Sequence, residues 1–192
     1  MDDDKSNGYE PLAHEFIRRR SRTIGATTVK EWSRALPRNA SVLELGCGSG
    51  VPISQVLADE GFALYAVDAS ATLLEAYRTR FPDAHVECAA VEESALFNRT
   101  FDGIVAWGLM FLLPAENQRL VIEKAARALA SGGKFLFTSG AEAGEWPDVM
   151  TRLMSVSLGA DEYRAILRSH GLTVEGELKD EGENHYYFAA RP

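Results

Sequence analysis

Apolar residues are spaced in two different patterns through most of this chain. Short apolar runs, which predict strands, cover residues 41–45, 62–67, 84–88, 101–107 and 134–138. Apolar residues at helical spacing, which predict helices, fill residues 51–60, residues 70–81 and the segment that Pro114 opens. Strands that alternate with helices in this way are typical of a parallel, doubly wound sheet.

The two ends of the chain depart from this alternation. Two helices are predicted before the first strand, one over residues 9–22 and one around Val29, Trp32 and Leu36, and both could cover the sheet edge or its ligand. After the fifth strand, residues 141–158 form a long segment that we expect to be irregular. A helix over residues 160–170 follows. Strands 172–178 and 185–190 are joined by a short turn, which predicts an antiparallel hairpin.

Composition narrows the classes of function. The chain has 192 residues, which favours one domain, and its net charge of -8 disfavours a nucleic-acid partner. It contains 2 cysteines and no CxxC pair, so we expect reduced thiols, no metal site and a cytoplasmic location. No apolar run approaches the ~18 residues that span a bilayer, so we expect no membrane partner.

A glycine-rich loop follows the first predicted strand. Residues 46–50 read Gly-Cys-Gly-Ser-Gly, and a helix comes directly after them. Strand, glycine turn and helix form the arrangement that binds nucleotide-like ligands in open α/β sheets. A dinucleotide fingerprint would place its third glycine at position 51, which is Val51 here. This spacing disfavours a nicotinamide-dependent oxidoreductase.

The loop with Glu44 before it resembles motif I of the class I S-adenosylmethionine-dependent methyltransferases. Further resemblances are Asp68 at the end of the second strand, Phe101-Asp102-Gly103-Ile104-Val105, the Gly132-Gly133 entry to strand five and the terminal hairpin. The resemblance implies a Rossmann-like, seven-stranded sheet that is mostly parallel, with the last strand antiparallel. It also implies a single methyltransferase domain over residues 1–192, in which residues 1–40 form an N-terminal helical cap and residues 41–192 form the core.

The same resemblance implies where S-adenosylmethionine would bind. Asp68 would bind the ribose hydroxyls, and Glu44 would lie under the methionine amino group. The family often has an aspartate where this chain has Ala90, so adenine recognition falls to Val91 and Glu92, although Glu92 could equally be an acid near a helix start. The complete set predicted to bind the cofactor is Tyr9, Arg20, Glu44, Gly46, Cys47, Gly48, Asp68, Ala69, Val91, Glu92 and Trp107.

Several members of this set have open alternatives, among them Glu44, which could be only a polar residue of the strand. Arg20 belongs to a basic cluster with Arg18, Arg19 and Arg22, which is either a solvated helix face or the source of one guanidinium for the cofactor carboxylate. Tyr9 would cover the cofactor, as an aromatic residue does in relatives with an N-terminal cap, or would simply be a surface residue. Cys47 belongs to the loop without a chemical role of its own.

The acceptor site is predicted at the same edge of the sheet. Met110, Phe111 and Trp146 are expected to line an apolar acceptor pocket, although Trp146 could serve only packing. Glu183 and His185 in the last hairpin are candidates to orient the acceptor or take its proton, with a solvated turn as the alternative.

These residues predict a methyltransferase that uses S-adenosylmethionine and transfers its methyl group to a small molecule by direct displacement. Positioning alone can supply about 7–11 kcal/mol of such a barrier, so the sequence needs no catalytic triad. The alternative is a non-catalytic, S-adenosylmethionine-binding protein that regulates a partner. The sequence indicates neither the acceptor atom nor the oligomeric state.

Overall fold

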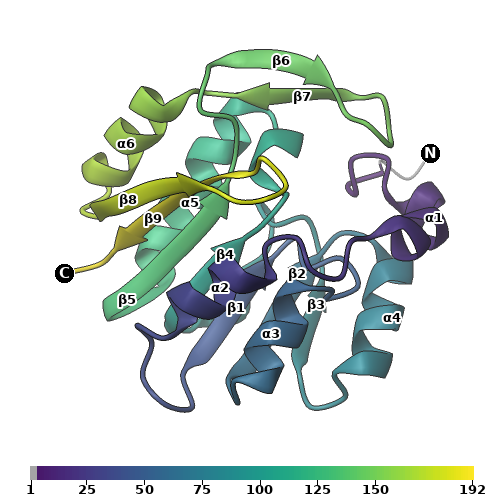
Figure 1. Cartoon of the computed structure of the whole chain (residues 1–192), viewed down its shortest axis with the longest axis horizontal. Helices are drawn as coiled ribbons and strands as arrows, with labels where there is room; N and C mark the ends of the chain where they lie inside the picture. The colour runs from purple at the N-terminus through teal and green to yellow at the C-terminus, as the bar shows by residue number, and fades with distance from the viewer. Residues whose placement is uncertain (1–3) are drawn as a thin grey trace.

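A computed structural model describes residues 4–192. Its main sheet has seven strands in the order β3-β2-β1-β4-β5-β9-β8 (Figure 1). These strands are β1 (Ser41–Leu45), β2 (Ala63–Asp68), β3 (His85–Cys88), β4 (Phe101–Ala106), β5 (Leu129–Thr138), β8 (Thr173–Lys179) and β9 (His185–Ala190). All neighbours are parallel except β9, which runs antiparallel to both β5 and β8. The predicted fold class is confirmed.

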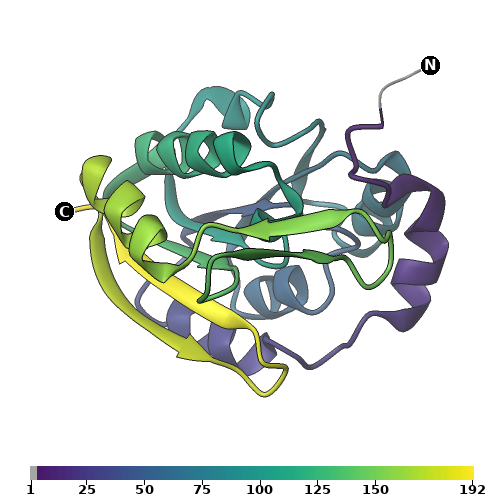
Figure 2. The same cartoon turned by 90° about the horizontal axis from the view of Figure 1, so that it is seen from above.

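Helices cover both faces of this sheet (Figure 2). The helices are α1 (Ala13–Arg19), α2 (Ala26–Ser33), α3 (Ile53–Asp59), α4 (Ala71–Arg80), α5 (Ala115–Ala128) and α6 (Ala160–Ser169). Buried side chains of α2, α3 and α4 join one apolar cluster, and those of α5 and α6 join a second cluster on the opposite face. None of the helices in residues 4–192 is both long and apolar enough to cross a membrane.

Amphipathic periodicity explains why these helices form and which face they bury. In α5, Val121, Ile122 and Ala125 are fully buried and recur at helical spacing. At the start of α4, the Ser70 hydroxyl accepts the backbone N–H of Leu73 at 3.1 Å, which satisfies an amide that has no partner within the helix. Because β1, β2 and β4 are parallel neighbours, their carboxyl ends lie at one edge of the sheet.

The structure corrects the sequence prediction in three segments. Residues 9–22 do not form one helix, because the short 3-10 helix η1 (Glu10–Leu12) precedes α1, and Arg20 leaves the helix with ψ 124°. Strand β5 begins at Leu129, before the predicted glycine turn. The third correction concerns the segment 141–158.

This segment forms an antiparallel pair, β6 (Gly144–Pro147) with β7 (Met154–Ser157), and not an irregular loop. The pair has only two strands, half of its residues are exposed and its two buried residues are Ser155 and Ser157, so it lacks the alternation of apolar and polar residues that predicts a strand. It lies over the carboxyl edge of the main sheet, with the N-terminal segment on the other side (Figures 1 and 2). The remaining short 3-10 helices are η2 (Leu96–Asn98) and η3 (Met110–Leu112).

Candidate functional site

A cavity of about 330 Å³ opens at the carboxyl edge of the sheet, beneath the N-terminal segment and the β6–β7 hairpin. Its walls come from the loops after β1, β2, β3 and β4, which is where open α/β sheets bind ligands. The residues predicted from sequence that line it are Tyr9, Arg20, Gly46, Cys47, Gly48, Asp68, Ala69, Val91, Glu92, Trp107, Phe111 and Trp146. The fold thus brings together residues that are more than 130 positions apart in the chain.

The glycine loop forms the floor of this cavity. Gly46 and Gly48 have φ angles of +67° and +55°, in the left-handed region that favours glycine. A Cβ on Gly46 would lie 2.9 Å from Leu109 Cδ1, and one on Gly48 would lie 3.2 Å from Phe16 Cε1. These two glycines keep the floor open between side chains from the N-terminal helix and from the loop after β4.

Asp68 connects the loop to the end of β2. One carboxylate oxygen accepts the backbone N–H of Gly48 at 2.7 Å, and the other accepts that of Ser70 at 2.8 Å. Burial raises the pKa of Asp68, and the two backbone donors counter part of this rise. The carboxylate lines the cavity and retains lone pairs to accept donors from a ligand.

Arg20 is the member of the basic cluster that enters the cavity. Its guanidinium lies 4.3 Å from the ring centroid of Trp107 and 5.0 Å from that of Phe16, and its Nε donates to the carbonyl of Val51 at 3.2 Å. Desolvation lowers the pKa of Arg20 to about 10. Within residues 4–192 no carboxylate forms an ion pair with it, so its remaining N–H groups can bind an anionic ligand group.

Glu44 lies behind the loop and does not line the cavity. It is only 4% exposed, and Ser54 of α3 donates a hydrogen bond to its Oε2. Burial raises the pKa of Glu44 to about 8, although Ser54 and Arg20 favour the charged form. Because protein covers its carboxyl group, Glu44 could act on the methionine amino group of the cofactor only through the glycine loop and not by direct contact.

The raised pKa of Glu44 predicts a pH-dependent stability. An acid whose pKa is raised in the folded protein stabilises the fold most below its ordinary pKa, about 4.5, and this contribution is lost as the pH rises through 8. Relative to the Glu44→Gln variant, the wild-type free energy of unfolding should fall by more than about 1.4 kcal/mol between pH 5 and pH 9, the equivalent of one pKa unit. Urea unfolding at both pH values measures this difference.

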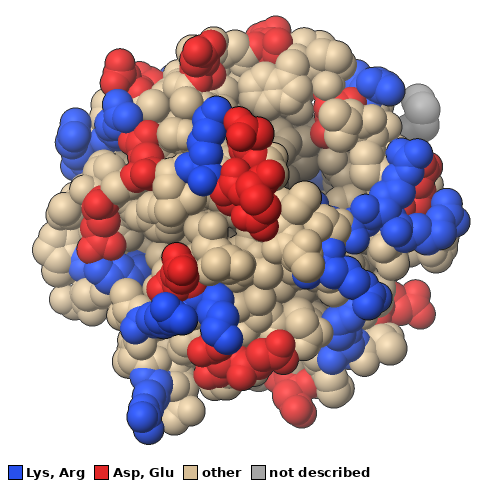
Figure 3. All heavy atoms as spheres, in the orientation of Figure 1, with Lys and Arg blue, Asp and Glu red and all other residues tan. Residues whose placement is uncertain are grey.

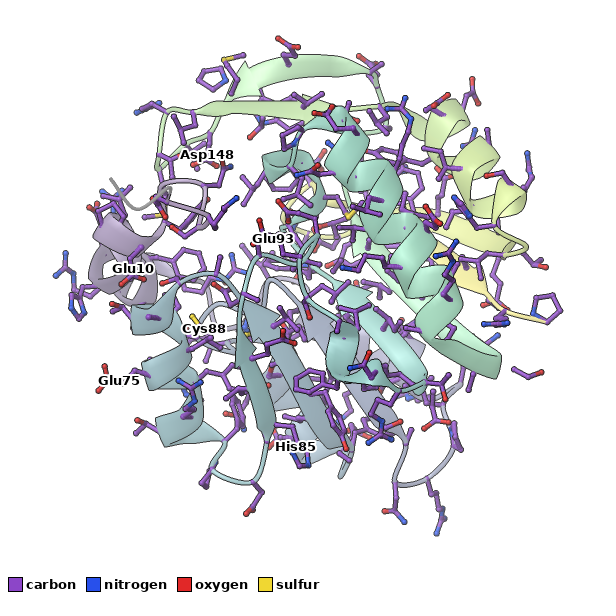
Figure 4. The ribbon with its side chains drawn as sticks, turned by 180° about the vertical axis from the view of Figure 1, so that it is seen from behind. Glu10, Glu75, His85, Cys88, Glu93 and Asp148 are labelled. Carbon is purple, nitrogen blue, oxygen red and sulfur yellow. The ribbon has the colours of Figure 1, made fainter. Side chains whose placement is uncertain are left out.

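The matched control for this experiment is Glu75→Gln on α4. Glu75 points away from the sheet into solvent (Figure 4), so its replacement should leave the pH dependence of wild type intact. A constant difference between wild type and Glu44→Gln at pH 5 and pH 9 would contradict the raised pKa.

The far end of the cavity is formed by the loop after β3. Ala90, Val91 and Glu92 line it. Lys124 of α5, which sequence reasoning missed, donates to the carbonyls of Val91 at 3.1 Å and Glu92 at 2.8 Å, and also to that of Ser94. Because one ammonium binds several carbonyls, the shape of this loop is fixed before any ligand enters.

The roof of the cavity joins the N-terminal segment to the hairpin. The Tyr9 hydroxyl donates to Asp148 Oδ2 at 3.2 Å, and Asp148 also accepts the backbone N–H groups of Met150 and Thr151. Glu10 accepts hydrogen bonds from Ser70 and Thr72 at the start of α4. Figure 4 shows Glu10 beside α4 and Asp148 at the turn of the hairpin. No local sequence pattern marks Glu10 or Asp148 as part of the site, because their hydrogen bonds to Thr72 and Tyr9 join segments that are far apart in the sequence.

A second cavity of about 560 Å³ adjoins the first. Both are lined by Phe111, Trp146 and Asn184, and the ring centroids of Phe111 and Trp146 are 5.9 Å apart. The predicted catalytic candidates Glu183 and His185 line this second cavity and not the first. Figure 3 shows the hollow on this face, with acidic side chains gathered at its rim.

Met110 is the predicted pocket residue that the structure places elsewhere. It is fully buried in the apolar cluster under α5, whereas its neighbour Phe111 lines both cavities. Neighbouring residues of a 3-10 helix point about 120° apart, so only one of the two can line the cavities. Phe16, Leu109 and Asn184 line the first cavity and were missed, because an apolar residue of a helix or loop and an amide in a turn give no sequence signal of ligand binding.

Comparison with known proteins supports the resemblance to methyltransferases. A family model of a methyltransferase domain matches residues 42–133, which contain the glycine loop, Asp68 and the Val91–Glu92 loop. Residues 42–133 are therefore similar to methyltransferase domains. Among curated proteins, it is 28% identical over 174 residues to a sarcosine/dimethylglycine N-methyltransferase of Aphanothece halophytica. That match covers 84% of this chain and 60% of the relative.

Solved structures of methyltransferases have a similar fold. The magnesium protoporphyrin IX methyltransferase of Synechocystis PCC 6803, with SAH bound, superposes with a TM-score of 0.77 at 16% identity, covering 99% of this chain and 100% of that one. An amino pentose methyltransferase from Micromonospora echinaspora, with SAM bound, gives 0.74 at 16% identity over 95% and 96% of the two chains. At these identities the likeness concerns the fold alone.

Proposed function

We propose that this protein binds S-adenosylmethionine in the first cavity and transfers its methyl group to a nitrogen atom of a small molecule. The observation that carries the proposal is the first cavity itself, where the glycine loop, Asp68 and Arg20 converge. A nitrogen acceptor is supported by the curated relative, named as a sarcosine/dimethylglycine N-methyltransferase. The domain organisation, a cap of residues 1–40 on a core of residues 41–192, remains part of this proposal.

The residues present fit such a cofactor. Asp68 would accept the ribose hydroxyls, the backbone of Val91 and the Glu92 side chain would bind the adenine, and Arg20 would bind the carboxylate of the methionine portion. The guanidinium suits that role because its Nη groups have no carboxylate partner among residues 4–192. Trp107 and Tyr9 would cover the cofactor on the remaining sides.

When bound, the cofactor supplies an electrophilic methyl group on a sulfonium. The chain orients the acceptor and excludes water, with the aromatic pair of Phe111 and Trp146 at the junction of the two cavities. A nucleic-acid acceptor is disfavoured by the net charge of -8 and by the acidic rim of the hollow (Figure 3).

Two measurements test the proposal. Calorimetry should show that the protein binds S-adenosylmethionine and its demethylated product, and labelled cofactor with a panel of small amines that includes sarcosine should give a product heavier by one methyl group. Absence of cofactor binding would reject the proposal. Tight binding without turnover of any amine or any fractionated cell extract would instead support the regulatory alternative.

A further inference from the structure

The second cavity contains a histidine whose partners are arranged for proton transfer. The Nε2 of His185 lies 2.8 Å from Glu177 Oε2, and this contact joins the start of β9 to β8. The other carboxylate oxygen of Glu177 accepts the Nε–H of Arg164 from α6 at 2.6 Å. The Tyr187 ring packs edge-on against the imidazole at 4.8 Å. The histidine is thus fixed from two sides.

This geometry determines which ring nitrogen is available. With Nε2 donating to the carboxylate, Nδ1 carries the lone pair, and no hydrogen bond to it is formed by residues 4–192. Burial tends to raise the pKa of Glu177, but the hydrogen bonds from Arg164 and His185 lower it, so the group remains a carboxylate. A carboxylate–imidazole pair of this kind holds the tautomer and stabilises the imidazolium that forms when Nδ1 takes a proton.

We propose that His185, positioned by Glu177, is the general base that removes a proton from an ammonium acceptor bound in the second cavity. This inference rests on the proposed methyl transfer to nitrogen. An ammonium ion has no lone pair, so one N–H proton must move to Nδ1 first. The free nitrogen then forms the bond to the methyl carbon as the carbon–sulfur bond breaks, and the sulfur keeps that electron pair.

The charges around the cavity agree with a cationic acceptor. Besides His185 it is lined by Glu142, Glu145, Glu183 and Lys179, so acidic side chains outnumber basic ones. The alternative candidate, Glu183, is 82% exposed and pairs with Lys179 at 3.2 Å. Among these groups His185 is the one whose side chain is held by a partner that is only 14% exposed.

Kinetics of the variants test the assignment against a purely structural role. At pH 7, the kcat of His185→Gln with the best amine of the panel should fall about 100-fold, the lower end of general-base effects. The loss should shrink at a pH where the acceptor is already a free amine, because no proton then needs to be removed. Glu177→Gln should show a smaller loss with the same pH dependence. The Kd for S-adenosylmethionine should be unchanged in both variants.

The matched controls are His170→Gln and Glu175→Gln. His170 is exposed at the end of α6, and Glu175 forms a surface ion pair with Lys134, so both variants should retain wild-type kcat. Wild-type kcat in His185→Gln at pH 7, or a loss that is equal at every pH, would overturn the assignment. Failure of wild type to bind the cofactor would count against the proposed function itself.

A readout independent of activity is nitrogen-15 NMR of the imidazole in wild type. His185 should be in the Nε2–H tautomer, with Nδ1 carrying the lone pair. An Nδ1–H tautomer overturns the assignment even if His185→Gln does not fold.

Discussion

Replacing Asp68 with alanine is expected to raise the Kd for S-adenosylmethionine by at least about 100-fold. Hydrogen bonds to a charged group contribute about 1.5–3 kcal/mol each, two ribose hydroxyls would lose their acceptor, and 1.4 kcal/mol corresponds to a factor of ten. The loop would also lose the acceptor of the Gly48 N–H, now at 2.7 Å. Isothermal titration calorimetry with the cofactor and with its demethylated product measures both affinities.

Two further variants separate ligand binding from the shape of the loop. Asp68→Asn keeps one carbonyl oxygen for the Gly48 N–H, so its Kd should lie between those of wild type and Asp68→Ala. Asp83→Ala removes an exposed acid from the turn before β3 and should bind as wild type does. A wild-type Kd in Asp68→Ala would exclude Asp68 from the cofactor site.

Replacing Gly50 with alanine is expected to lower the free energy of unfolding by about 3 kcal/mol. Gly50 has φ +79°, and a Cβ there would lie 2.9 Å from Tyr77 Cδ2 and still closer to Phe81, both buried rings at the end of α4. Overpacking a core costs about 1–3 kcal/mol, and a left-handed residue with a side chain costs about 1–2 kcal/mol. Urea unfolding measures the sum.

Gly61→Ala provides the matched control for Gly50. Gly61 has nearly the same φ, +82°, but nothing lies within 4 Å of a Cβ at that position. Its replacement should therefore cost only about 1–2 kcal/mol, from backbone strain alone. Equal losses in the two variants would show that Tyr77 and Phe81 move aside easily, and that packing does not require Gly50.

The three glycines of the loop have different roles. Gly46 and Gly48 line the cavity, whereas Gly50 does not and instead allows α4 to pack against the loop. The spacing of the glycines distinguished the loop from a dinucleotide fingerprint, but it treated all three alike. Only the position of two aromatic rings, about 30 residues further along the chain, reveals the difference.

The arginine cluster shows the same limit of local patterns. Four arginines between residues 18 and 22 look equivalent in the sequence. Because α1 ends at Arg19 and the chain then turns to an extended conformation, Arg20 is the one placed against Trp107. The end of a short helix depends on its tertiary contacts as much as on helix propensity. The sequence could therefore predict that an arginine of this cluster reaches the ligand, but not that it is Arg20.

The alternation of strands and helices, the glycine loop with its acid at the end of β2, and the antiparallel last strand could all be predicted from the sequence. These features depend on periodicity and on residues close together in the chain. The tertiary structure decided that Met110 is core and Phe111 cavity wall, that Tyr9 contacts Asp148, and that Glu177 holds His185. Each of these depends on which side chains from distant elements meet, and no local pattern contains that information.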